Sequence, residues 1–259
     1  MTVARCLTIA TSDSSGGAGI QADLKAFAAA GCHGMSAIVA LTAQNTVAVR
    51  AIHELPADFI VAQIDAVIDD IGVDAAKTGM LFSAAIIETV ADRLAGTGFP
   101  LVVDPVMVAA SGAQLLRDDA VASLVRLLFP RATVITPNLP EAEALTGHRG
   151  TRAELAERLH AMGAPAVLVT GGHGERAVDH LYDGRDHHEI PVTRHAIPAT
   201  HGAGCTHSAT LCARLARGDD LLTAAHTASQ VAAGAVLHGL VEIGAGEGPV
   251  NALHGVVPC

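Results

Sequence analysis

The chain has 259 residues, of which half are apolar, and its formal net charge is −10 at pH 7. With five Phe, one Tyr and no Trp, its core must be built from aliphatic side chains. The length suits one large α/β domain over residues 1–259, while the negative charge disfavours nucleic acid or an anionic membrane as a partner. An anionic small ligand would need local donors, such as helix N-termini, or a metal ion.

The cysteines and histidines exclude several other classes of protein. The five cysteines are odd in number and form no CxxC pair, which indicates reduced thiols in a cytoplasm rather than a disulfide framework. The fourteen histidines form no HExxH motif and no zinc-finger spacing with cysteine. The long apolar segment 221–243 contains polar side chains such as His226 and Glu242, so we predict a buried Ala-rich helix rather than a membrane span.

Predicted strands and helices alternate over most of the chain. Strands are predicted at residues 5–11, 34–42, 47–55, 74–78, 100–103, 132–135 and 166–170, followed by a hairpin of 176–183 and 187–192. Helices are predicted at residues 20–30, 57–71, 83–94 with Ser83 as the cap, 115–128, 140–146, 152–162, from 205 to about 214, and from Leu221. This order predicts a mostly parallel sheet with helices on both faces.

Polar and glycine residues follow three of the predicted strands. Asp104-Pro105, Pro137-Asn138 and Gly171-Gly172 each stand where an aliphatic strand ends. Ligands of open α/β sheets bind at the carboxyl ends of the strands, so we expect these groups to meet at one edge. The first loop rich in glycine, residues 12–19, contains Gly16-Gly17-Ala18-Gly19, which does not fit the GxGxxG dinucleotide fingerprint, and the chain has no Walker A motif.

A second glycine loop leads into the helix that begins near Cys205. Pro198, Gly202 and Gly204 interrupt regular structure just before it. The free N–H groups and the dipole of a helix N-terminus favour an anion there, such as a phosphoryl group. The same position predicts a lowered pKa for the Cys205 thiol. An ordinary loop before a helix with a buried cysteine is the alternative.

Asp104 and Glu141 are the carboxylates that we single out at this edge. Mg²⁺ prefers oxygen ligands and keeps several waters while it bridges phosphates, and two carboxylates suit such a hydrated ion. The alternatives are an Asp-Pro turn for Asp104 and a charge at a helix N-terminus for Glu141.

Six segments in the same order resemble the hydroxymethylpyrimidine/phosphomethylpyrimidine kinases of thiamine biosynthesis, in the ribokinase-like superfamily. They are residues 14–25 (SSGGAGIQADLK), 43–46 (AQNT), 77–81 (KTGML), 104–107 (DPVM), 136–142 (TPNLPEA) and 201–206 (HGAGCT). The cysteine at the helix start is similar to this family's, where most ribokinase-like relatives carry aspartate. The resemblance implies a three-layer α/β sandwich, ATP and Mg²⁺ as cofactors, a small pyrimidine substrate and a homodimer.

The resemblance also implies roles for individual residues. Gly202, Ala203 and Gly204 would form the anion hole with Cys205, and Cys205 would be the base. The pyrimidine would be bound by Gln44, Asp23, Gly19, Met80, Val106 and Met107. The nucleotide would be bound by Asn138, Thr170, Gly172 and Lys77, and the magnesium ion by Asp104 and Glu141. An amide at Gln44 suits an aminopyrimidine because it offers both a donor and an acceptor.

Three departures from the family pattern keep other readings open. Thr170 stands where relatives often have Lys, Ala203 where they usually have Thr, and residues 109–113 lack a Lys and an Asp common there. A pyridoxal kinase on the same frame, or a paralogue with altered pyrimidine preference, is therefore an alternative. A non-catalytic pyrimidine-binding protein and a cysteine-nucleophile hydrolase are further ones. Gln44 favours the aminopyrimidine, and the combined acidic and cysteine residues favour a kinase.

Overall fold

A computed structural model describes residues 2–107 and 115–256 of the chain. Within these ranges one sheet has the strand order β3-β2-β1-β4-β5-β6-β7-β8-β9. The strands are β1 (Arg5–Asp13), β2 (His33–Gln44), β3 (Val49–Glu54), β4 (Ala75–Thr78), β5 (Leu101–Val103), β6 (Val134–Ile135), β7 (Val167–Val169), β8 (Val178–Tyr182) and β9 (His187–Pro191). Neighbours from β2 through β7 pair in parallel, whereas β3, β8 and β9 pair antiparallel at the two ends.

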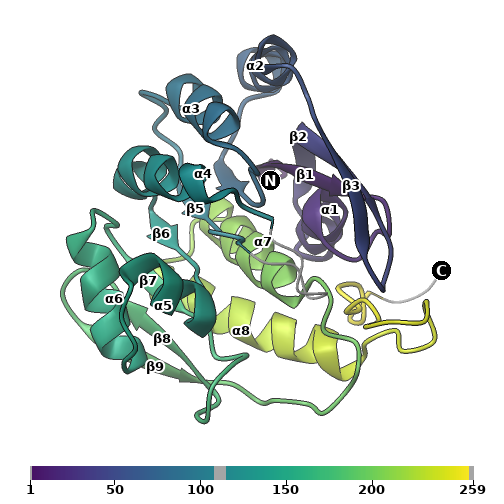
Figure 1. Cartoon of the computed structure of the whole chain (residues 1–259), viewed down its shortest axis with the longest axis vertical. Helices are drawn as coiled ribbons and strands as arrows, with labels where there is room; N and C mark the ends of the chain where they lie inside the picture. Colours follow the sequence, from purple (N-terminus) through teal and green to yellow (C-terminus); the bar gives the residue numbers. More distant parts are fainter. Residues whose placement is uncertain (1, 108–114, 257–259) are drawn as a thin grey trace.

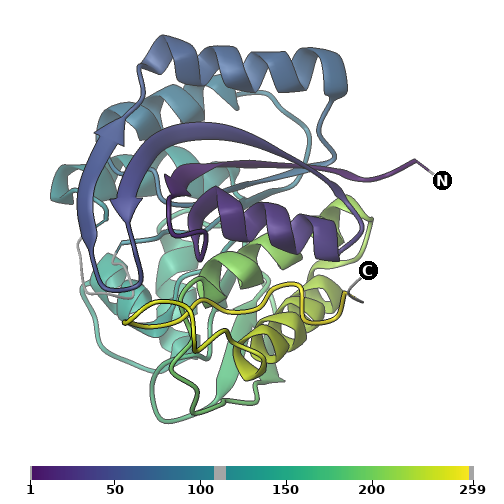
Figure 2. The same cartoon turned by 90° about the vertical axis from the view of Figure 1, so that its right-hand side faces the viewer.

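Helices cover both faces of this sheet (Figures 1 and 2). One face carries α1 (Gly19–Ala29), α7 (Ala203–Ala216) and α8 (Leu221–Leu237). The other carries α2 (Ala57–Ala66), α3 (Ala84–Arg93), α4 (Asp118–Ser123), α5 (Leu139–Thr146) and α6 (Arg152–Ala161). Short π-helical and 3₁₀ turns, η1 (Val67–Ile71), η2 (Leu124–Leu128) and η3 (Phe129–Arg131), extend α2 and α4. The predicted three-layer α/β sandwich is confirmed.

Two aliphatic cores lie on the two faces of the sheet. Side chains of a strand alternate between its faces, and β5 illustrates this. Leu101 and Val103 pack in the core under α2 to α6, while Val102 packs in the core under α1, α7 and α8. All three side chains are buried. The central strands therefore read as continuous aliphatic runs, as strands covered on both faces do.

Three predicted details of the helices were wrong. The helix expected from residue 115 begins at Asp118, because the N–H groups of Leu115 and Leu116 both donate to the Met107 carbonyl. Ser83 stands at the N-cap of α3, but its hydroxyl donates to Glu54 at 2.5 Å and does not cap the helix.

The helix expected over residues 221–243 ends earlier, at Leu237. Gly239 packs so closely that a Cβ there would lie 2.5 Å from Ala199, and the next N–H, of Leu240, donates to Pro249. Beyond it Ile243 is 43 % exposed. Throughout residues 2–107 and 115–256, no helix combines the length and the hydrophobicity that crossing a bilayer requires.

Candidate active site

A cavity of about 710 Å³ opens at the carboxyl edge of the parallel strands, within the usual size range of small-molecule sites. The N-terminus of α7 faces this edge, and α8 forms one wall. Every site residue expected from the sequence lines the cavity: Gly19, Asp23, Gln44, Lys77, Met80, Asp104, Val106, Met107, Asn138, Glu141, Thr170, Gly172, Gly202, Ala203, Gly204 and Cys205. The topology thus gathers residues that are up to 186 positions apart (205 minus 19). The role of each remains a prediction.

The start of α7 presents free backbone donors to the cavity. Gly202 is the N-cap with a φ of +85°, and a Cβ there would lie 1.8 Å from the Gly17 carbonyl oxygen, so only glycine fits. The Ala203 N–H, expected in the anion hole, instead donates to the Thr200 carbonyl in the turn that Gly202 allows. The N–H groups of Gly204 and Cys205 have no backbone partner among the described residues, and they are the donors that remain.

The Cys205 thiol differs from the sequence prediction. The half-buried thiol is desolvated in the cavity, and this, together with the carboxylates of Asp23 and Asp104, raises its pKa to about 12. The Lys77 ammonium and the Gly19 N–H act in the opposite direction but do not outweigh them. The predicted lowering of the pKa was wrong, because the helix N-terminus competes with desolvation and with two nearby negative charges.

Lys77 lies buried beneath the cavity among acidic groups. Its ammonium is 2.8 Å from Asp23 and 3.8 Å from Asp104, with both aliphatic stem and charge fully buried. Burial lowers the pKa of Lys77, but Asp23, Cys205 and Asp104 outweigh it and raise that pKa above its usual range. The second Asp23 oxygen accepts the Thr8 hydroxyl at 2.6 Å. Both oxygens of Asp23 therefore have partners within the protein.

Glu141 and Asn138 form the N-terminal capping box of α5. The Asn138 side chain accepts the Glu141 N–H at 2.9 Å, and Glu141 accepts the Asn138 N–H at 3.0 Å. The other Glu141 oxygen accepts the Met107 N–H at 3.3 Å. This cap fixes the direction of the Glu141 carboxyl toward the edge of the sheet.

The charges around Glu141 fit a divalent cation. Burial raises the pKa of Glu141 to about 8, and repulsion by the negative charge of Asp104 adds to this effect. The Thr136 hydroxyl beside them is buried and makes no hydrogen bond in the described part of the chain. No set of three or more His, Cys, Asp or Glu side chains in that part is arranged as a metal cage. Two carboxylates suit a hydrated Mg²⁺ that also binds phosphates.

The part of the cavity beside the loop after β7 includes a residue that sequence reasoning missed. The Arg194 guanidinium donates to the carbonyls of Gly171, His173, Gly174 and Arg176 and so shapes the loop after β7. Arg194 lies in a segment without a motif, which left no signal for it. Small side chains of α8 also line the cavity: Ser229, Ala232, Ala233 and Val236.

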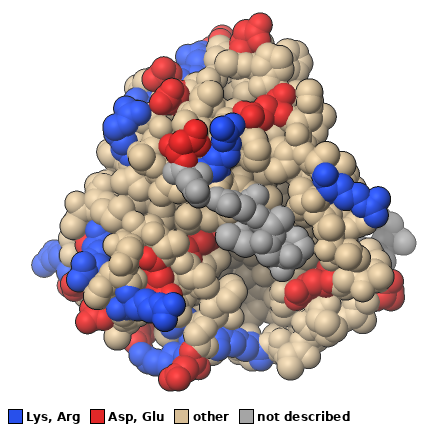
Figure 3. Space-filling view, in the orientation of Figure 1, with Lys and Arg blue, Asp and Glu red and all other residues tan. Residues whose placement is uncertain are grey.

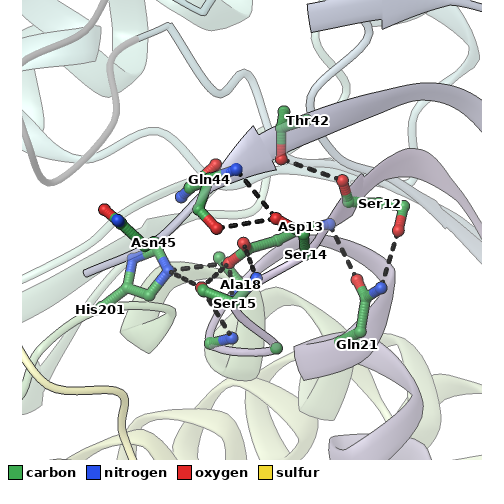
Figure 4. A network of polar contacts seen from close by, with 12 residues as sticks. Ser12, Asp13, Ser14, Ser15, Ala18, Gln21, Thr42, Gln44, Asn45 and His201 are labelled. Carbon is green, nitrogen blue, oxygen red and sulfur yellow. Dashed lines mark hydrogen bonds and ion pairs between the residues drawn. The ribbon is translucent and has the colours of Figure 1, made fainter. Parts of the chain in front are cut away.

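Asp13 and His201 also line the cavity and were not singled out as site residues from the sequence. His201 Nε2 lies 2.8 Å from Asp13, and both side chains are buried at the cavity (Figure 4). Asp13 belongs to β1 and His201 precedes the helix-start glycine, so 188 residues separate them. No spacing rule connects residues so far apart, and only the fold brings them together.

The sheet, the donors at the α7 N-terminus and the paired carboxylates define a ribokinase-like small-molecule kinase. A family model described as phosphomethylpyrimidine kinase matches residues 13–251. The chain therefore belongs to the phosphomethylpyrimidine kinase family, and the predicted family is confirmed.

Of three similar proteins, two carry the name of this family and one is a pyridoxal kinase. The hydroxymethylpyrimidine/phosphomethylpyrimidine kinase of Bacillus subtilis is 47% identical, over 97% of this chain and 95% of the relative. The structure of an ADP complex of Bacillus subtilis pyridoxal kinase superposes with a TM-score of 0.90 at 38% identity, covering 99% of this chain and 100% of that one. A phosphomethylpyrimidine kinase structure from Clostridium difficile gives 0.78 at 40% identity, covering 88% and 97%.

We predict that Cys205 is slow to react with iodoacetamide at pH 8. A pKa of about 12 in place of 9.0 leaves about a thousandth of the usual thiolate fraction. The alkylation rate of Cys205, followed by peptide mass spectrometry against glutathione as the reference thiol, should therefore be about a thousand-fold lower and should rise steeply above pH 10. Alkylation as fast as glutathione at pH 8 would contradict the raised pKa.

Proposed function

We propose that the protein phosphorylates 4-amino-5-hydroxymethyl-2-methylpyrimidine with ATP, and then phosphorylates the monophosphate to the diphosphate used in thiamine biosynthesis. One observation carries the proposal: Gln44, the paired carboxylates and the donors at the α7 N-terminus line one cavity. The family membership and the 47% identity to a bifunctional hydroxymethylpyrimidine/phosphomethylpyrimidine kinase support it. The whole chain, residues 1–259, would act as one kinase domain.

Gln44 would select the pyrimidine. Its amide offers a donor and an acceptor, which match an exocyclic amine and the adjacent ring nitrogen. Its backbone is held in place because the Ser14 hydroxyl donates to its carbonyl at 2.7 Å and accepts its N–H at 2.8 Å. Met80, Val106 and Met107 would form the apolar walls around the ring, next to Gly19 of the first glycine loop.

The N–H groups of Gly204 and Cys205 would stabilise the migrating phosphoryl group. Phosphoryl transfer depends on positioning and on charge stabilisation more than on covalent chemistry by the protein. Preorganised N–H donors act strongly where water is excluded, and the helix dipole adds to their effect. When bound, Mg·ATP supplies the phosphoryl group and part of the neutralising charge. Asp104 and Glu141 would hold the ion, and Asn138, Thr170 and Gly172 would line the phosphate path.

The base role proposed for Cys205 depends on the charges beside it. Asp23 and Asp104 both raise the pKa of the thiol, and Asp23 is already paired with Lys77. A cation held by Asp104 would neutralise the effect of Asp104 and lower the pKa of the Cys205 thiol. Cys205 would then accept the proton of the substrate hydroxyl as the new P–O bond forms. Lys77, buried beneath the cavity beside Asp23 and Asp104, would help to stabilise the Cys205 thiolate.

Pyridoxal phosphorylation is the second candidate. Pyridoxal also carries a hydroxymethyl arm on an aromatic nitrogen ring, and the similar structure at a TM-score of 0.90 is that of a pyridoxal kinase. Gln44 favours the aminopyrimidine because that ring offers both a donor and an acceptor to the amide.

The direct test offers the purified protein hydroxymethylpyrimidine, its monophosphate and pyridoxal, each with Mg·ATP, and identifies products by mass spectrometry. We expect both pyrimidine phosphates, a slower reaction with pyridoxal, and no product when EDTA removes the metal ion. The dependence on metal follows from the mutual repulsion of Asp104 and Glu141. A faster reaction with pyridoxal would favour the second candidate, and no product from any substrate would refute the kinase proposal.

We predict that Gln44→Ala weakens pyrimidine binding about ten-fold or more, because it removes the ring's donor and acceptor partners. Isothermal titration with hydroxymethylpyrimidine measures the effect, and ATP binding should change little. Gln230→Ala, at an exposed amide on α8, is the matched control and should bind normally. Unchanged binding by the Gln44 variant would remove this residue from the pyrimidine pocket.

For its assembly and location we propose a homodimer in the cytoplasm, with no nucleic-acid or membrane partner. Exposed apolar side chains at the β2–β3 hairpin and the nearby C-terminal segment support self-association: Leu41, Val47, Val241 and Ile243. Lys and Arg are scattered among acidic residues on the face drawn in Figure 3, which offers no basic patch there. Light scattering should give a molar mass of twice the 26.3 kDa of one chain. A monomer mass at micromolar concentration would refute the dimer.

A further inference from the structure

The buried pair of Asp13 and His201 joins the two glycine loops of the site. We call residues 14–19 the first glycine loop and residues 200–205 the anion loop. Asp13 accepts the N–H groups of Ser15 and Ala18, each at 2.8 Å, and the Ser15 hydroxyl, also at 2.8 Å. It accepts His201 Nε2 at the same distance (Figure 4). One carboxylate therefore closes its own loop and also holds the other.

The backbones of the two loops touch directly. A Cβ at Gly17 would lie 2.2 Å from the His201 ring, and a Cβ at Gly202 would lie 1.8 Å from the Gly17 carbonyl oxygen. The loops thus pack against each other both through the His201 ring and through the backbones of Gly17 and Gly202, so a shift of one displaces the other. The His201 backbone is itself anchored: its N–H donates to Gly248 and its carbonyl accepts from Val250.

The contact between Asp13 and His201, which we call the joint, is connected on one side to Gln44 and on the other to the start of α7. On one side, Ser14 follows Asp13 directly and holds the Gln44 backbone through two hydrogen bonds of 2.7 and 2.8 Å. On the other side, His201 precedes Gly202, whose left-handed backbone starts α7 and its free donors. Gln44 and the anion loop are thus connected through Ser14, Asp13 and His201.

We propose that Asp13 and His201 are a positioning pair that sets the separation between the pyrimidine-reading amide and the phosphoryl-binding donors. The inference rests on the proposed kinase function and adds a residue pair to it. Phosphoryl transfer needs the acceptor oxygen and the phosphoryl group in near contact, and a misplacement of about 1 Å costs about a hundred-fold in rate. A joint that ties both loops together controls that separation.

Two variants of His201 separate positioning from simple packing. His201→Gln keeps a side-chain N–H that reaches Asp13, whereas His201→Leu fills similar space without a donor. For His201→Leu we expect kcat to fall about a hundred-fold. Binding of hydroxymethylpyrimidine should change less than about three-fold, because the pocket around Gln44 is retained. More ADP than phosphorylated pyrimidine should form, since water then competes with a displaced acceptor. His201→Gln should retain most of the rate and the one-to-one product ratio.

The matched control breaks an ion pair at the opposite end of α7. Asp219 pairs with Arg214 at 2.5 Å, and Asp219→Asn should lower thermal stability without changing kcat or the product ratio. Wild-type kcat and a one-to-one ratio in His201→Leu would overturn the positioning role. The positioning role would also be overturned if Asp219→Asn showed the same fall in kcat and the same excess of ADP. General destabilisation would then explain the effects of His201→Leu.

Hydrogen–deuterium exchange tests the joint without any reaction. In His201→Leu, peptides that cover residues 14–19 and 200–205 should lose protection together, whereas His201→Gln should resemble the wild type. Faster exchange in the anion loop alone would overturn the coupling. This measurement also separates the two proposals: a wild type that phosphorylates no substrate refutes the kinase function, and the exchange data still decide whether the pair joins the loops.

Discussion

The site depends on one buried cation. The Lys77 ammonium is fully buried and lies 2.8 Å from Asp23 and 3.8 Å from Asp104. It is also close enough to Cys205 to lower the pKa of that thiol. Removing one partner of a buried pair leaves an uncompensated charge and typically costs about 3–5 kcal/mol. This charge allows α1, β4, α7 and the end of β5 to bring acidic and nucleophilic groups together beneath a cavity.

Negative charge and burial also act on the two ionisable groups nearest the edge of the cavity. Glu141 has its pKa raised to about 8 and Cys205 to about 12, both through burial and nearby carboxylates. In each case the partners that favour the ionised form, Lys77 and the Gly19 N–H for Cys205 and two backbone N–H groups for Glu141, do not outweigh desolvation and the nearby carboxylates. A divalent ion bound together with ATP would lower the pKa values of both Glu141 and Cys205. The backbone donors at the start of α7 and the acidic edge would therefore together complement the magnesium–nucleotide complex proposed above.

Much of the fold and the composition of the site followed from the sequence. Aliphatic runs such as residues 100–103 predict strands buried on both faces, and glycines at 16, 17 and 19 and at 202 and 204 mark turns before helices. Every residue singled out from motifs lines one cavity. The errors lie where a tertiary contact overrides a local rule: Ser83 donates to Glu54 instead of capping α3, and Leu115 and Leu116 pair with Met107 instead of extending α4. The departure noted at residues 109–113 lies outside the described residues.

The sequence by itself determined the alternation of strands and helices, the breaker-rich loops at the strand ends and the kinds of side chain that meet there, because hydrophobic period, turn residues and helix caps are local properties. It also carried the motifs of the kinase family. Only the tertiary structure decided the protonation of Cys205, the ion pair of Lys77 with Asp23 and the joint between Asp13 and His201. These properties depend on burial and on distances between groups far apart in the chain, which no local pattern encodes.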